Sequence, residues 1–164
     1  MHCVYMLQTY LLCTMAVVRL TKIFTFEMAH ALYNYDGKCK NIHGHSYKLE
    51  VTVIGEPLAL SGHAADGLLI DFGDLKKIVN SKVVDIFDHA LVMKKDYPEE
   101  LSKVLDDNFE RLEYVNYQPT CENLIADFAD KIKNSLPKDV KLHHLVLHET
   151  ATAFCEWYAN DQTK

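Results

Sequence analysis

Two long stretches of alternating apolar and polar residues, joined by a short loop, constrain the fold of this chain most strongly. Residues 18–30 place apolar side chains such as Phe24 and Phe26 on one parity, and residues 43–55 alternate in the same way. Because successive side chains of a strand point to opposite faces, each stretch is predicted to be a half-buried strand. Each predicted strand also carries histidines on its apolar side. His30 ends the first strand, while His43 and His45 begin the second.

These three histidines indicate a metal site. If the two strands pair as an antiparallel hairpin, His30 can approach His43 and His45 across a strand gap of about 5 Å. Hydrogen-bonded core histidines are the alternative, but two histidines at i and i+2 with a third on a neighbouring strand favour metal binding. Three neutral imidazoles suit Zn²⁺ and leave a fourth position open. We therefore expect a zinc ion at this position.

Cys39 precedes the histidine pair, with three residues between it and His43. It could be a fourth zinc ligand in a closed structural site. It could instead be a base or nucleophile beside an open metal, because Lys38, Lys40 and a bound cation would all favour the thiolate. The spacing slightly favours the catalytic role.

The rest of the chain predicts two long helices and two more strands. Apolar residues recur at helical spacing over residues 73–87, and again from Thr120, a good N-cap, to Leu136. The closing segments 141–148 and 153–158 are predicted strands. The expected order ββααββ indicates an α+β domain, a four-stranded antiparallel sheet with the two helices on one face. Its open edges could be covered by oligomerisation.

Two further carboxylates are candidate site residues. Asp88 and His89 follow the first helix, where the histidine could simply complement the helix dipole, or the pair could work in acid–base catalysis. Glu149 follows an apolar strand, where it could be a solvated turn residue. It could instead hold a flat nitrogen heterocycle through a bidentate contact.

Composition narrows the functional classes. The chain has 164 residues, 49% hydrophobic and 24% charged, which fits one soluble globular domain. A net charge of −6 argues against broad binding of nucleic acid or of an anionic membrane. Five cysteines, an odd number without a CxxC pair, favour reduced thiols and a cytoplasmic location.

The first residues are apolar but lack the basic start of a secretory signal, and they are too short to span a bilayer. Met15 could be the working start codon, with residues 1–14 as an upstream extension; a weak signal peptide is the less favoured alternative. Residues 15–164 would then form the single domain. A charged segment at about residues 93–117 includes a predicted helix start at Pro98 and a short extended stretch after Glu110.

Six segments in order resemble the 6-pyruvoyl-tetrahydropterin synthase superfamily over about residues 18–158. They are Phe24–His30, Cys39–Tyr47, Asp71–Phe72 with Leu75–Lys76, Asp88–His89, Pro119–Leu124 and His148–Thr150. The resemblance implies the tunnelling fold, in which subunits join their sheets into a barrel, usually as a hexamer of two trimers.

The resemblance also implies roles for the candidate residues. His30, His43 and His45 would bind zinc, Cys39 would be the base, and Asp88 with His89 would form a proton relay. Glu149 would anchor a pterin ring, helped by the turn from Thr120 to Glu122. We expect a small-molecule pterin triphosphate as the substrate, and neither nucleic acid nor a membrane as a partner.

The short interval between Cys39 and His43 resembles the queuosine-pathway branch, 6-carboxy-5,6,7,8-tetrahydropterin synthase. That branch implies a lyase that converts 7,8-dihydroneopterin triphosphate to 6-carboxytetrahydropterin, releasing acetaldehyde and triphosphate. Two alternatives stay open: 6-pyruvoyl-tetrahydropterin synthase activity, which only eliminates triphosphate, and a non-enzymatic, zinc-stabilised oligomer. The segment 93–117 is longer than in compact members of the branch and is interpreted as an insertion.

Overall fold

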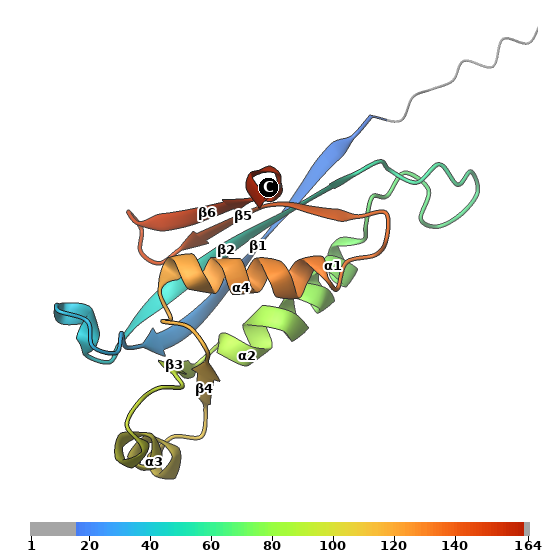
Figure 1. Cartoon of the computed structure of the whole chain (residues 1–164). Helices are drawn as coiled ribbons and strands as arrows, with labels where there is room; N and C mark the ends of the chain where they lie inside the picture. The colour runs from blue at the N-terminus through green and yellow to red at the C-terminus, as the bar shows by residue number, and fades with distance from the viewer. Residues whose placement is uncertain (1–15, 163–164) are drawn as a thin grey trace, which may run out of the picture.

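The computed structural model describes residues 16–162 and shows one twisted sheet with the helical segments of residues 72–87 and 121–133 packed on one face (Figure 1). The upstream extension expected at residues 1–14 lies outside the described residues. The strands are β1 Val18–His30, β2 His43–Gly55, β3 Ala90–Lys94, β4 Leu112–Val115, β5 Lys141–His148 and β6 Phe154–Tyr158. The helical segments are η1 Lys38–Lys40, α1 Phe72–Val79, η2 Asn80–Val84, α2 Asp85–Phe87, α3 Glu99–Asn108, α4 Cys121–Lys133 and η3 Ala159–Gln162.

The sheet has six strands in the order β4-β3-β1-β2-β5-β6, so the prediction of a four-stranded antiparallel sheet was wrong in part. The four predicted strands are present as antiparallel neighbours. Two more strands extend the sheet in parallel, β3 beside β1 and β4 beside β3. Strand β3 does not alternate because its first four residues, Ala90 to Met93, are all buried.

The β1–β2 hairpin brings the three histidines together. The two strands pair over their full length, from Val18 opposite Gly55 to His30 opposite His43. The burial of β1 and β2 follows the predicted alternation, with Tyr47, Leu49, Val51 and Val53 facing the core. Since His43 and His45 share that parity, their rings lie on the helix-covered face, at one end of the sheet.

Helices α1, α2 and α4 cover this apolar face (Figure 1), whereas α3 packs against Leu91 and Met93 on the opposite face of β3. The predicted helix over residues 73–87 is observed as α1, η2 and α2, with a π-helical turn in its middle. Asp71 caps α1 by accepting a hydrogen bond from the Gly73 amide. Helix α4 begins at Cys121 as predicted, and its side chains Leu124, Phe128 and Ile132 are buried in the main core. No helix within residues 16–162 is both long and apolar enough to cross a membrane.

The segment at residues 93–117 folds mainly as helix α3 and strand β4, which lie beyond β3 at the edge of the sheet (Figure 1). It has a small core of its own, in which Leu105 of α3 packs with Ala31, Leu91 and Met93. The helix start predicted at Pro98 and the extended stretch after Glu110 are both confirmed.

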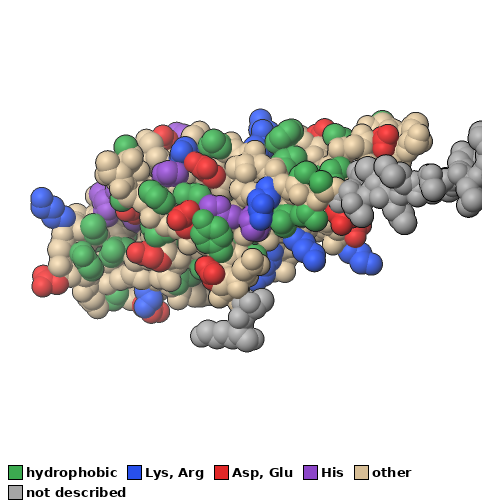
Figure 2. Space-filling view, turned by 90° about the horizontal axis from the view of Figure 1, so that it is seen from above, with side chains coloured by type: hydrophobic (Ala, Val, Ile, Leu, Met, Phe, Trp, Pro, Cys, Tyr) green, Lys and Arg blue, Asp and Glu red, His purple; other side chains and the backbone are tan. Residues whose placement is uncertain are grey.

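The surface shown in Figure 2 carries acidic and basic side chains interspersed, with histidines among them. It is a mixed-charge face and not a broad basic field, as the net charge of −6 indicated.

Candidate metal centre and active site

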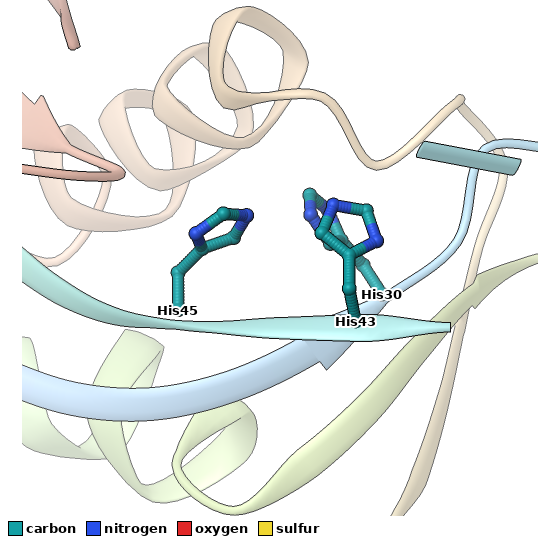
Figure 3. Close-up of side chains that lie close together, drawn as sticks. All are labelled: His30, His43 and His45. Atoms are coloured by element: carbon teal, nitrogen blue, oxygen red, sulfur yellow. The ribbon is translucent and has the colours of Figure 1, made fainter. Parts of the chain in front are cut away.

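The rings of His30, His43 and His45 converge from two neighbouring strands (Figure 3). One ligand nitrogen from each lies within 4.8 Å of the others. The His30 ring centroid is 4.5 Å from that of His43 and 5.3 Å from that of His45. The sequence prediction that the hairpin would gather these three side chains is confirmed.

Backbone carbonyls orient two of the rings. His30 Nδ1 lies 2.6 Å from the Pro119 carbonyl oxygen, and His43 Nδ1 lies 2.8 Å from the Asn41 carbonyl oxygen. A carbonyl oxygen can only accept, so each Nδ1 carries the hydrogen and donates it. In the neutral form this leaves the Nε2 lone pair of both rings free. Histidines that bind metals typically have such a backbone partner on the second nitrogen.

The cluster fits a metal ion for a second reason. The Nε2 atoms of His30 and His45 are buried without a hydrogen-bond partner in the described structure. Buried polar atoms normally have a hydrogen-bond partner, so two such nitrogens in a cluster of three imidazoles fit the ligand set of a metal ion. Burial also lowers the pKa of His30, an effect partly opposed by its hydrogen bond to Pro119. The lowered pKa favours the neutral form of His30, which is the form that binds metals.

Glu149 lies beside the three histidines, in the turn after β5. Its Oε1 atom is 3.9 Å from Nε2 of both His30 and His45, and it accepts a hydrogen bond of 3.2 Å from the Tyr47 hydroxyl. Burial, and then the carboxylate of Glu149, raise the pKa of Tyr47, so this hydroxyl keeps its proton. The side chain of Glu149 is 26% exposed, which leaves it open to a ligand.

Thr120 and Glu122 lie at the start of α4, next to the residue whose carbonyl holds His30. Thr120 caps the helix, its hydroxyl accepting a hydrogen bond from the Asn123 amide. Glu122 is exposed in the first turn, where a carboxylate is favoured by the helix dipole. The structure thus brings these two residues to the same end of the sheet as the histidines.

Cys39 lies in η1, in the loop between β1 and β2. Its carbonyl accepts a hydrogen bond from the Leu32 amide, which closes the loop, and its side chain is half-buried. Lys38 and Lys40 flank it and are exposed. The loop therefore holds the thiol at the end of the hairpin where the histidines lie.

Asp88 and His89 are not brought to the histidine cluster. Asp88 Oδ1 accepts a hydrogen bond from the Glu27 amide and lies 3.0 Å from His89 Nδ1. The hydrogen bond from the Glu27 amide is the main cause that lowers the pKa of Asp88, and His89 adds to it. The His89 side chain is 72% exposed and borders a groove of about 720 Å³ with Glu27 and Ser46. Those two residues have the opposite parity from the histidines, so the groove lies mainly on the other face of the hairpin, although His45 also borders it.

Sequence reasoning did not single out Tyr47 or Pro119 as site residues. The sequence did contain a sign that Tyr47 belongs to the site, because it lies two residues after His45 and therefore points to the same face of the strand. Pro119 contributes only its carbonyl oxygen, and no side-chain pattern reveals which carbonyl a distant histidine will meet.

Comparison with known proteins decides the family. The family model described as 6-pyruvoyl tetrahydropterin synthase matches residues 19–160. The chain belongs to this family. A 6-carboxy-5,6,7,8-tetrahydropterin synthase of Haemophilus influenzae is 35% identical over 85% of this chain and 97% of its own length. A dihydroneopterin monophosphate aldolase of Pyrococcus furiosus is 32% identical over 76% of this chain and 83% of its own.

A solved structure supports the same assignment. The 6-pyruvoyl tetrahydropterin synthase of Caenorhabditis elegans superposes with a TM-score of 0.62 at 25% identity, covering 88% of this chain and 97% of that one. The predictions of this superfamily and of an enzyme of the lyase type are confirmed. Members bear different names, so family membership alone does not determine which reaction this enzyme catalyses.

Proposed function

We propose that this enzyme converts 7,8-dihydroneopterin triphosphate to 6-carboxy-5,6,7,8-tetrahydropterin, releasing acetaldehyde and triphosphate. The observation that carries the proposal is the convergence of three imidazoles with the carboxylate of Glu149 at one end of the sheet. The name of the Haemophilus relative and the short interval between Cys39 and His43 support this branch of the family.

We propose that His30, His43 and His45 hold zinc. When bound, zinc supplies a positive charge that stabilises oxyanions as they develop on the substrate side chain. Cys39 acts as the base that removes a side-chain proton. Lys38 and Lys40, one on each side of it, are the proposed phosphate contacts.

Glu149 holds the pterin ring by accepting hydrogen bonds from a ring N–H and the exocyclic amine. A carboxylate has lone pairs on both oxygens, so it can take these donors while keeping the bond from Tyr47. Thr120 and Glu122, at the start of α4, line the same end of the site. Fixing the ring places the reacting carbons over the histidine cluster and within reach of Cys39.

Asp88 and His89 face away from the cluster of their own chain, so we propose that they act in the site of a second subunit. The subunits would assemble as the hexamer of two trimers that the family resemblance implies. His89, oriented by Asp88, would donate or accept protons as triphosphate leaves and the carbon–carbon bond breaks.

The main alternative is 6-pyruvoyl-tetrahydropterin synthase activity, which shares the first half of the reaction and leaves the carbon chain intact. The two activities differ in their products. Release of triphosphate without acetaldehyde from the zinc-loaded protein would show that the alternative is right.

A zinc-stabilised oligomer without activity is a rival of another class. In it Cys39 would be a fourth ligand, so Cys39→Ala would weaken zinc binding strongly. Our proposal predicts near-full zinc occupancy of Cys39→Ala with activity lost. Measuring the metal content and the turnover of Cys39→Ala distinguishes the enzyme from the inactive oligomer. Cys155→Ala is the control and should keep both zinc binding and activity.

A further inference from the structure

The buried hydroxyl of Tyr47 lies between the histidine cluster and Glu149. Tyr47 is 1% exposed, and its ring stacks on Phe26 at 5.3 Å with an interplanar angle of 10°. The rings of His30 and His45 meet it edge-on at 6.3 and 5.7 Å. These contacts leave the Tyr47 ring little freedom, so its hydroxyl is a fixed point in the site.

That hydroxyl bonds to one oxygen of Glu149. The donor and Oε1 are 3.2 Å apart, and the same Oε1 faces Nε2 of His30 and of His45 at 3.9 Å. Oε1 is thus directed toward the interior of the site. Because the side chain is partly exposed, the carboxylate is anchored on its inner side and open on its outer side.

The turn that carries Glu149 is built independently of Tyr47. The amides of Glu149 and Thr150 both donate to the Ala153 carbonyl, and the Thr150 hydroxyl accepts from the amides of Thr152 and Ala153. These bonds fix the backbone of the turn. The backbone bonds do not fix the orientation of the Glu149 carboxylate, which depends on the contacts of the side chain itself.

We propose that Tyr47 is a positioning residue that holds the Glu149 carboxylate in the orientation needed to bind the pterin ring. The inference rests on the proposed function and adds to it the residue that sets the geometry of ring recognition. Without the hydroxyl the carboxylate turns freely, and it must be ordered each time a ring binds.

Tyr47→Phe removes the hydroxyl and keeps the stacked ring. The probe is neopterin, a fluorescent oxidised pterin without phosphates, titrated against the zinc-loaded full-length protein. We expect Tyr47→Phe to weaken neopterin binding about tenfold, as for a hydrogen bond to a charged group. The KM for the triphosphate substrate should rise by a similar factor, with kcat changed less than about threefold.

A double-mutant cycle separates positioning from a merely structural role. If Tyr47 acts through Glu149, adding Tyr47→Phe to Glu149→Ala should change neopterin binding less than about twofold. Tyr117→Phe is the matched control, since its hydroxyl also donates to a carboxylate, that of Asp127 at 2.8 Å. It should leave neopterin binding unchanged.

Wild-type affinity in Tyr47→Phe, or an equal loss in the presence and absence of Glu149, would overturn the inference. Failure of the wild-type protein to bind neopterin or to turn over the substrate would instead defeat the proposed function. Zinc content and the thermal midpoint, measured on every variant, show that each is folded and loaded.

Discussion

The orientation of two of the three imidazoles in the cluster has an identifiable cause. The Pro119 carbonyl fixes His30, and the Asn41 carbonyl fixes His43. Because both bonds use Nδ1, the Nε2 atoms of the two rings remain free to bind a metal ion. This preorganisation lowers the conformational entropy lost when a metal ion binds.

Removal of one imidazole should abolish tight zinc binding. His45→Ala takes away a ligand nitrogen that has no hydrogen-bond partner in the described structure. We expect its zinc affinity to fall by more than about 100-fold, since even the loss of a second-shell partner costs 10–100-fold. Competition with a chelator of known affinity measures this.

His63 provides the control, because it is exposed in the loop after β2 and outside the cluster. His63→Ala should keep the wild-type affinity. Equal zinc binding by His45→Ala and the wild-type protein would show that the cluster is not the metal site.

The start of helix α4 both caps the helix and orients a histidine of the site. Pro119 holds His30, the next residue Thr120 caps the helix, and the helix packs its buried face on the sheet. Thr120→Ala should lower the free energy of unfolding by about 1 kcal/mol, because one amide of the first turn loses its partner. Urea denaturation measures the change.

Thr120→Ser keeps the hydroxyl and should restore most of that stability. If the alanine variant is as stable as the serine variant, the capping bond contributes nothing and this account of the helix start is wrong.

Local sequence patterns predicted the helices and strands that are buried on one face and exposed on the other. Strands β1 and β2 alternate cleanly, so their bounds, their pairing and the meeting of the histidines could all be inferred. Strand β3 was missed because it is short and buried on both faces. Its apolar run could not be distinguished from a loop that follows a helix.

Because strand β3 was missed, the position of Asp88 and His89 in the fold could not be predicted either. It depends on β3 joining the sheet in parallel beside β1, which sets His89 against Glu27. A pairing between segments about 60 residues apart leaves no local pattern in the sequence.

In the molecule as a whole, the candidate site residues lie in two groups, one on each side of the β1–β2 hairpin. Cys39 and the histidine cluster lie at the end of the sheet, and His89 borders the groove on the opposite face. A closed symmetric assembly could bring the groove of one subunit to the cluster of the next.

Hybrid oligomers test this arrangement. Cys39→Ala and His89→Ala should each be inactive alone. If a site takes Cys39 from one subunit and His89 from another, random 1:1 hybrids should regain activity in about a quarter of their sites. Activity of co-expressed, doubly tagged hybrids is the measurement. Hybrids as inactive as either parent would place both residues in the site of one subunit.

We propose that the enzyme both eliminates triphosphate and cleaves a carbon–carbon bond of its substrate. The most direct measurement is the ratio of acetaldehyde to triphosphate released from 7,8-dihydroneopterin triphosphate by the zinc-loaded protein. Our account predicts one acetaldehyde for each triphosphate, with 6-carboxytetrahydropterin as the pterin product. Triphosphate release without acetaldehyde, or no release of either, would contradict it.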